Sequence, residues 1–465
     1  MNYIDLLKKE KIHIDDLIIK TINLKNNILN IINIETITSS NIINNFLLKN
    51  SFYLNKLDYN QLFNYILNYL PNNIILKNYK EILRYLYNGY TIIIINNKKI
   101  IAIETKNNLS RGVSEINYEK TIIGPKDSFI EHFNINLGLI RKRIKSNELS
   151  TISYEIGKYT KTKIGIIYIN NIAKKETANK IKNKIKKINI DGIIDSNYLK
   201  RYLNSNNLFP TIKSTERPDL TCQSLLEGKI AIIVDNSPEI LILPTFFIDF
   251  FHTSDDYYQK KINISFIRLI RLLAFLISIF LPAIYISLTT YNPDSMSLNL
   301  LISFQSQRQN VPFPSFIEAI MMIISFEILR ETDIRIPSSM GSAISILGGL
   351  VLGEALVNAN IVSPIMIIVV SLSAISGMTN SSIEIINAIR WYRFILIILA
   401  SIFGFYGIFL GIILILNTLA NIKTLDLDYL YPFAPINIKE QKDGFFRLNN
   451  NNRNPLLSNN KKRGN

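Results

Sequence analysis

The sequence predicts an α/β N-terminal region of two subdomains, followed by an α-helical transmembrane bundle of four to five apolar segments. Three observations lead to this prediction. Nearly all the lysines lie before residue 262 or after residue 420. The long apolar runs lie between these limits, and several reach the ~18 residues that cross a hydrocarbon core. Before residue 262, short β-rich runs alternate with helix-like ones, which is typical of a compact α/β domain.

The charge balance points to a membrane surface. The chain has 465 residues, with 52 Lys and Arg against 36 Asp and Glu, and a formal charge of +16. Such a balance suits either nucleic acid or anionic lipid. Because Lys260, Lys261, Arg268 and Arg271 directly precede the first apolar span, we expect membrane lipids as the partner and no nucleic acid. The one cysteine, Cys222, can make no internal disulfide.

Residues 1–85 form a divergent N-terminal segment to which the sequence assigns no chemistry. The start of the chain lacks the compact apolar core of a secretory signal, so we expect this region to stay on the side where it is made. The first α/β subdomain covers residues 86–150 and could include part of the preceding segment. Its β-rich runs Thr91–Ile95 and Ile100–Glu104 flank two asparagines and two lysines, which predicts a hairpin.

The second α/β subdomain covers residues 151–262. Lys163–Ile169 is β-rich, Lys174–Ile188 reads as a basic helix, and two further β-rich runs follow at Lys229–Val234 and Glu239–Leu243. The helix carries seven lysines. We interpret them as a solvated outer face rather than an anion or lipid site.

One charged motif stands out in the second subdomain. Thr215-Glu216-Arg217-Pro218-Asp219 places a guanidinium between two carboxylates, and Pro218 favours an extended Arg217. The segment could be a charge-paired latch between domains, or an ordinary polar turn.

A pair of acids joins this subdomain to the apolar region. Asp255 and Asp256 could suggest a metal, but no partner follows at ligand spacing. A helix N-cap is therefore the preferred interpretation.

The transmembrane domain covers residues 263–420. Its first clear span is Leu272–Leu288, in which Pro282 is tolerated if neighbours satisfy the carbonyl that it frees. The next apolar segment, Pro312–Leu329, carries Glu318 and Glu327 on one helical face to within about a quarter turn. We expect this segment to be partial or interfacial.

The longest apolar run lies between Arg335 and Glu384 and is long enough for two passes, with a break around Asn358, Asn360 and Pro364. Small residues recur at every fourth position of its first half: Gly341, Ser345, Gly349 and Gly353. They form a stripe that suits either close helix packing or the lining of a pore. Glu354, the one ionisable residue of the run, is costly in lipid and is therefore a candidate functional residue.

The end of the chain decides the topology. Ile383–Arg393 resembles an interfacial helix, and Phe394–Leu419 is the last predicted span. The basic tail, residues 421–465, is expected in the cytoplasm together with the N-terminal region. Both ends on one side require an even number of crossings. We therefore prefer four spans; five would put the tail outside.

The sequence offers little for catalysis. The histidines, His13, His132 and His252, lie far apart without metal-spaced partners. No phosphate-binding glycine loop and no nucleophile elbow appears. We expect no enzyme activity, no cofactor and no metal. The remaining classes are a channel or transporter component, a receptor, and a membrane scaffold.

Motifs from about Asn88 to Ile436 match one family in its order. They are Ile123–Glu131, Leu139–Arg143, Thr215–Asp219, Leu226–Ala231, Asp255–Tyr258, Pro312–Pro314, Phe326–Glu331, Val362–Met366 and Tyr431–Pro435. The chain thus resembles the A subunits of GerA-type spore germinant receptors. Two positions depart from the family: Ile116 stands in place of Pro, and Asn236 in place of a turn Gly, whose positive φ Asn tolerates.

The resemblance implies a protein of the spore inner membrane that works with a transporter-like B subunit and a lipoprotein C subunit. It also implies a homo-oligomeric ring that conducts ions when nutrient binds. The candidate pore or gate residues are then Glu354 with its small-residue stripe, Glu318 and Glu327. The motif Thr215–Asp219, with the turn at Gly124 and Pro125, becomes a structural latch.

Two alternatives remain open under this resemblance. The chain could transmit the signal as a scaffold while a partner conducts. It could also be the accessory homologue of the family, which works without B and C subunits.

Overall fold

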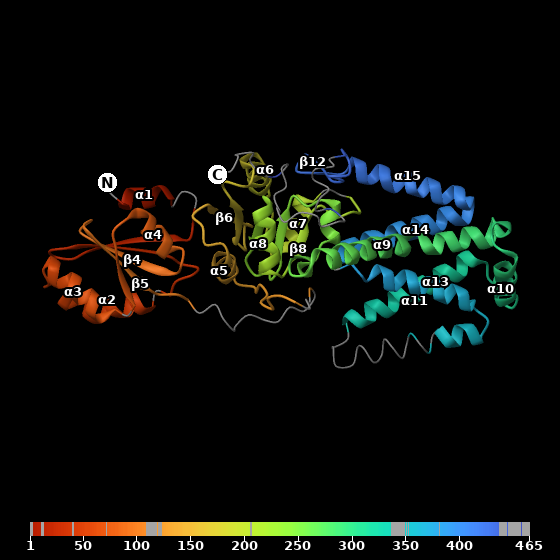
Figure 1. Cartoon of the computed structure of the whole chain (residues 1–465), viewed down its shortest axis with the longest axis horizontal. Helices are drawn as coiled ribbons and strands as arrows, with labels where there is room; N and C mark the ends of the chain where they lie inside the picture. Colours follow the sequence, from red (N-terminus) through yellow and green to blue (C-terminus); the bar gives the residue numbers. More distant parts are fainter. Residues whose placement is uncertain are drawn as a thin grey trace. The chain divides into compact units, whose positions relative to one another are not determined.

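The chain folds as two compact units. The computed structural model describes residues 3–10, 14–39, 41–70, 72–107, 119, 123–204, 207–335, 349, 351, 353–380, 382–436, 444 and 457. The sheet unit draws its residues from Met1–Ser205, Ile212–Thr245 and Asn450–Asn465. The helical unit draws its residues from Asn206–Thr211 and Phe246–Asn449. Figure 1 shows the sheets and helices of each unit.

The first sheet of the sheet unit is antiparallel and has the order β1-β2-β4-β5-β3. Its strands are β1 (Leu17–Asn23), β2 (Ile28–Ile34), β3 (Asn73–Leu76), β4 (Tyr90–Ile95) and β5 (Lys99–Glu104). Its helices are α1 (Tyr3–Glu10), α2 (Asn41–Leu54), α3 (Tyr59–Tyr69) and α4 (Tyr79–Leu86). Three of the five strands therefore come from before residue 86.

Helices cover both faces of this sheet, which explains the run of isoleucines in β4. Ile92 and Ile94 belong to the core that includes α1 and α4, whereas Ile93 and Ile95 belong to the core that includes α2 and α3. Because successive side chains of a strand point to opposite faces, a doubly covered strand is apolar throughout. The predicted hairpin is confirmed, with positive φ at Asn96 and Asn97.

The second sheet is also antiparallel, in the order β6-β7-β9-β10-β8. Its strands are β6 (Leu149–Ile156), β7 (Thr162–Ile169), β8 (Lys213–Thr215), β9 (Ile230–Val234) and β10 (Ile240–Leu243). Its helices are α5 (Phe133–Arg143), α6 (Lys175–Lys186), α7 (Ser196–Leu203) and α8 (Pro218–Glu227). The lysine-rich α6 buries Ile181 and Ile185 and exposes Lys180 and Lys184, as a solvated outer face requires. Asn236 has φ 65°, as expected for a residue in place of a turn glycine.

The helical unit begins with two short 3-10 helices and continues with long apolar helices. They are η1 (Phe247–Phe251), η2 (Ser254–Tyr257), α9 (Lys261–Thr290), η3 (Pro293–Ser295), α10 (Leu298–Arg308), α11 (Ser315–Arg335), α13 (Pro364–Gly377), α14 (Ile383–Phe403) and α15 (Phe405–Asn421). A small hairpin follows, β11 (Lys423–Thr424) with β12 (Leu427–Asp428). Helix α9 packs against α13 and α14, and α14 packs against α15.

Among the described residues, two helices are long and apolar enough to cross a membrane, α9 and α14. Helices α13 and α15 are apolar but shorter. The break that the sequence predicts in the long apolar run is confirmed: a turn at Asn360, with φ 54°, precedes α13. A bundle of four or five spans stays a prediction.

The prediction of one last span over Phe394–Leu419 is wrong, because the helix stops at Gly404. Gly404 has φ 58°, and α15 folds back along α14. A Cβ on Gly407 would collide with the Leu399 carbonyl, so the absence of a side chain allows the close approach of the two helices. The predicted interfacial helix Ile383–Arg393 is the first half of the continuous α14.

The first and last segments of the helical unit lie together. The Phe247 amide donates to the Tyr429 carbonyl at 3.0 Å, and their rings make an edge contact with centroids 6.1 Å apart. The Tyr429 amide in turn donates to the carbonyl of Ile422. The segment before α9 and the segment after α15 therefore meet at one end of the unit.

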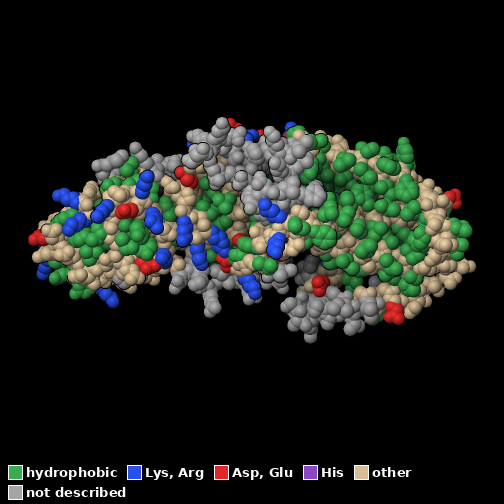
Figure 2. Space-filling model, viewed as in Figure 1, with side chains coloured by type: hydrophobic (Ala, Val, Ile, Leu, Met, Phe, Trp, Pro, Cys, Tyr) green, Lys and Arg blue, Asp and Glu red, His purple; other side chains and the backbone are tan. Residues whose placement is uncertain are grey.

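The two units differ in surface chemistry. On the face shown in Figure 2, hydrophobic side chains gather over the helices of the helical unit, and Lys and Arg side chains gather over the sheet unit. Phe266 of α9 and Phe409 and Ile413 of α15 are each more than half exposed. An apolar surface of this extent is typical of a membrane protein or of a protein interface.

Candidate functional site

Of the predicted pore residues, Gly349, Gly353 and Glu354 are helical residues that lie before α13. Glu354 is exposed, and a Cβ on Gly349 or Gly353 would meet no atom within 4 Å. Gly341 and Ser345 lie outside the described residues. Within this chain, the described part of the stripe is thus open rather than packed.

The structure places Glu318 deep in the helical unit, beside the start of α13. Its side chain is 0% exposed. One carboxylate oxygen accepts from the Ser363 amide (2.9 Å) and hydroxyl (2.8 Å), and the other lies 3.3 Å from an Arg308 guanidinium nitrogen. Ser363 is the N-cap of α13, so the Glu318 carboxylate lies at the positive end of the helix dipole and beside one arginine.

Pro282 creates a second polar centre inside the bundle. Proline has no amide hydrogen, so the carbonyl of Ser278, four residues earlier, loses its helical donor. Two side chains from other helices replace that donor: Arg393 Nε of α14 and Ser373 Oγ of α13, each at 2.8 Å. The expectation that neighbours satisfy the freed carbonyl is confirmed. The proline thereby ties three helices together.

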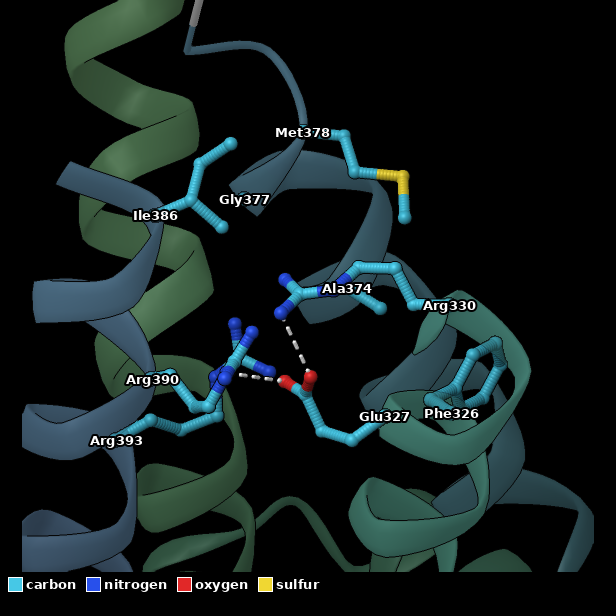
Figure 3. Close-up of a pocket in the computed structure, with 9 residues that line it drawn as sticks. All are labelled: Phe326, Glu327, Arg330, Ala374, Gly377, Met378, Ile386, Arg390 and Arg393. Atoms are coloured by element: carbon cyan, nitrogen blue, oxygen red, sulfur yellow. Dashed lines mark ion pairs between the residues drawn. The ribbon is translucent and has the colours of Figure 1, made fainter. Parts of the chain in front are cut away.

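Glu327 lies in a third cluster, separate from that of Glu318. Its carboxylate makes ion pairs with Arg330 of its own helix (2.9 Å) and with Arg390 of α14 (3.1 Å). Figure 3 shows that Arg330, Arg390 and Arg393 direct their guanidinium groups toward this carboxylate. The shared helical face predicted for Glu318 and Glu327 therefore does not give one acidic site.

The acidic pair before α9 is a clamp and not a helix N-cap. Asp256 is buried and accepts from Arg268 (2.8 Å) and Arg271 (3.1 Å), both in the first turns of α9. Arg268 also donates to the Gly444 carbonyl at 2.8 Å. The N-cap prediction is wrong because these two arginines are stronger partners for Asp256 than free amides. Among the described residues, no group of three or more His, Cys, Asp or Glu could hold a metal.

The Thr215–Asp219 motif joins the segment around residues 119–129 to the second sheet. Arg217 is 1% exposed, and its guanidinium binds the Asp219 carboxylate at 3.0 and 2.7 Å. The same guanidinium donates to the carbonyls of Glu119 (3.1 Å) and Pro125 (3.0 Å). Gly124 precedes this contact with φ 133°.

The neighbouring carboxyl group of Glu119 is buried as well. It accepts a hydrogen bond from the Thr215 hydroxyl. Burial raises the pKa of Glu119, and the nearby Lys213, Thr215 and Arg217 counteract only part of this effect. The motif thus holds a buried ion pair between Arg217 and Asp219 and contacts the carboxyl group of Glu119 through Thr215.

The two sheets of the sheet unit are joined by an ion pair that sequence reasoning did not find. Arg141 of α5 binds Asp16 through two hydrogen bonds, 2.7 and 2.6 Å long, and both side chains are nearly fully buried. Thr36 adds a third hydrogen bond to the same carboxylate at 2.7 Å. The residues are 125 positions apart, and the one available signal was an arginine within the motif Leu139–Arg143.

Comparisons with known proteins identify the family of this chain. The family model for the Bacillus/Clostridium GerA spore germination protein matches residues 5–455. Spore germination protein KA of Bacillus subtilis (strain 168) is 38% identical over 74% of this chain and 64% of its own length. The membrane protein YfkQ of the same organism is 39% identical over 75% of this chain and 68% of its own length.

Other similar proteins are also named as spore germination proteins. Spore germination protein XA of Bacillus anthracis is 34% identical over 79% of this chain and 76% of its own length. Among solved structures, the N-terminal domain of the A subunit of the Bacillus megaterium spore germinant receptor GerK3 covers 52% of this chain and 94% of that domain, with 26% identity and a TM-score of 0.40. On the strength of the match over residues 5–455, this chain belongs to the GerA spore germination protein family.

Proposed function

We propose that this chain is the A subunit of a nutrient germinant receptor in the spore inner membrane. Membership of the GerA family supports a role in germination. The exposed apolar faces of α9 and α15 support a membrane location, as does the name of the relative YfkQ, a membrane protein. Because the chain spans 64% of the length of spore germination protein KA, the activity of that whole protein enters only as a proposal.

The proposed mechanism is that several copies form or gate an ion-conducting path. The observation that carries it is the exposed Glu354 beside Gly349 and Gly353, where an added Cβ would meet none of the described residues within 4 Å. A carboxylate within an apolar run is costly in lipid unless it faces water or protein. In a ring of copies, the Glu354 carboxylates would line one axis and attract cations.

Glu318 and Glu327 fit this role less well than Glu354. Each already makes an ion pair with at least one arginine of the same chain. Such carboxylates hold helices together, and arginines of the same subunit neutralise their charge. We therefore assign the cation-attracting role to Glu354 first.

The test replaces Glu354 in spores and measures ion release after nutrient is added. We expect Glu354→Gln and Glu354→Ala to slow cation release several-fold, because both remove the charge from the path. The matched control is Asp294→Asn, an exposed acid in the short helix η3 after α9. Normal release and ion selectivity in both Glu354 variants would remove this residue from the mechanism.

The proposed partners are the transporter-like B subunit, which takes the nutrient, and the lipoprotein C subunit. We propose that the N-terminal region and the C-terminal tail both lie in the cytoplasm. The contact between Phe247 and Tyr429 supports an even number of crossings between them. Co-purification of B and C subunits with this chain from spore membranes tests the partnership. Adjacent B and C genes would favour the receptor, and their absence would favour the accessory homologue.

A second candidate is signal transmission without conduction. The clamp of Asp256 on Arg268 and Arg271 favours it, because it fixes the start of α9 to the segment before it. Such a rigid joint could pass a movement into the bundle. Currents recorded from the purified chain in lipid bilayers would contradict this candidate. Currents that require an added B subunit would support it.

A further inference from the structure

A small cavity in the helical unit is lined by more positive than negative groups. Its charged lining consists of Arg330, Arg390, Arg393 and Glu327, which come from α11 and α14 (Figure 3). The lining carries three guanidinium groups and one carboxylate, so positive charges exceed negative charges by two. This excess distinguishes the cavity from a closed ion pair.

Arg393 is the group that most lacks a counter-charge. Arg393 is 6% exposed, and its Nε donates to a neutral acceptor, the carbonyl of Ser278. Among the described residues, the ion pairs of this cluster all involve Glu327, and they go to Arg330 and Arg390. A buried charge without an opposite charge is costly, and more so inside a bundle surrounded by lipid.

The structure leaves free space beside this guanidinium. Gly377 of α13 lies next to it, and a Cβ at this position would come within 3.4 Å of Arg393 Nη2. The cavity has a volume of about 30 Å³, and about 10–15 Å³ of such space is enough to hold one water molecule. It therefore admits one small group. Its other walls include the apolar Phe326, Met378 and Ile386, and an apolar wall strengthens electrostatic attraction.

We propose that this cavity binds a single small anionic group, held by Arg393 with Arg330 and Arg390 beside it. Guanidinium groups bind carboxylate, phosphate and halide by charge and by their fixed N–H geometry. The group could belong to a free ion or to a lipid headgroup that reaches between α11 and α14. This inference concerns binding by one chain and does not depend on the proposed conduction.

The experiment measures thermal unfolding of the full chain purified in a neutral detergent. At constant pH and ionic strength, a bulky organic sulfonate salt is replaced stepwise by acetate or by chloride. A separate arm compares nanodiscs of anionic phosphatidylglycerol with nanodiscs of phosphatidylcholine, both in the sulfonate buffer. Because a ligand that binds the folded state raises its stability, we expect the Tm to rise with the concentration of the fitting anion.

Three variants assign the shift to the cavity. Arg393→Gln removes the charge, and Gly377→Val fills the space while keeping all three arginines; both should lose the anion-dependent rise. Arg335→Gln, which removes an exposed guanidinium from α11, the helix that carries Arg330, should keep the rise. If Arg393→Gln does not fold, Gly377→Val decides.

The outcomes separate the sources of the anion. A rise with acetate or chloride identifies a free ion, and a rise confined to anionic nanodiscs identifies a headgroup. Absence of any rise in the wild-type chain overturns the proposal and means that the cavity holds water. An equal rise in the wild type and in Gly377→Val overturns it as well, because the anion would then bind elsewhere.

Discussion

Buried arginines of this chain differ in what neutralises them, as Arg141 and Arg217 of the sheet unit and Arg393 of the helical unit show. In the sheet unit, Arg141 meets the carboxylate of Asp16 at 2.6 Å, and Arg217 meets that of Asp219 at 2.7 Å. In the helical unit, Arg393 donates to a backbone carbonyl, while the nearby Glu327 is shared by two other arginines. The first arrangement is balanced, and the second carries an excess of positive charge.

This difference indicates which buried charges can still bind a ligand. A matched, buried ion pair leaves neither charge nor space for a ligand, so it serves as a joint between segments. An excess of charge next to a small cavity can still gain free energy from a ligand. Three variants test this contrast.

The largest effect is expected from Arg141→Ala. It leaves the buried carboxylate of Asp16 without its cation, and breaking such a pair costs about 3–5 kcal/mol. The free energy of unfolding of the sheet unit within the full chain is measured by proteolysis in denaturant. The control is Arg143→Ala, two residues along the same helix, whose ion pair with Asp127 is only half-buried. Equal losses in both variants would contradict the special role of the buried pair.

A smaller effect is expected from Arg393→Met. The variant removes one hydrogen bond to the Ser278 carbonyl, worth about 1–2 kcal/mol, but it also removes an uncompensated charge. Ser373 still donates to the same carbonyl. The free energy of unfolding, measured by heating in detergent without a small anion, should therefore fall less than it does for Arg141→Ala. A larger loss would mean that Arg393 is structurally as essential as a matched pair.

The smallest effect is expected at Glu119, whose carboxyl group accepts a hydrogen bond from the Thr215 hydroxyl. Burial raises its pKa in the folded chain above the ordinary value of 4.5. Its contribution to stability is therefore full below the unfolded pKa and declines as the pH rises through the folded pKa. Glu119→Gln should abolish this decline and be more stable than the wild type at neutral pH.

The measurement for Glu119 is the Tm as a function of pH in both proteins. Glu155→Gln, which replaces an exposed carboxylate of β6, is the control and should leave the profile unchanged. A Glu119→Gln profile parallel to that of the wild type would show that the carboxyl group is solvated.

Local features of both units could be predicted from the sequence. The isoleucine runs around Asn96 and Asn97 predicted the β4–β5 hairpin, because asparagine tolerates the positive φ that a tight hairpin turn needs. The freed carbonyl was predicted from Pro282 alone, because proline always lacks the amide hydrogen. The break before α13 followed from polar residues and proline in an apolar run.

Other features escaped the sequence because their causes are not local. The stretch Phe394–Leu419 is apolar throughout, and nothing in its hydropathy distinguishes one long helix from a hairpin bent at Gly404. The partners of Asp256 could not be chosen either, since many bases precede the first span. The same limit applied to the ion pairs of Glu318 with Arg308 and of Glu327 with Arg390, because these arginines belong to other helices.

The sequence alone predicts the division into a basic α/β region and an apolar helical region. Its motifs, which occur in a fixed order, indicate the family. Hydrophobic periodicity and composition act along the chain, so they can be read without a structure. Which polar groups meet follows from the tertiary structure. Asp16 and Arg141 lie 125 positions apart in the sequence, and Ser278 and Arg393 lie 115 positions apart. An ion pair depends on distance in space, and that distance is set by the packing of whole elements.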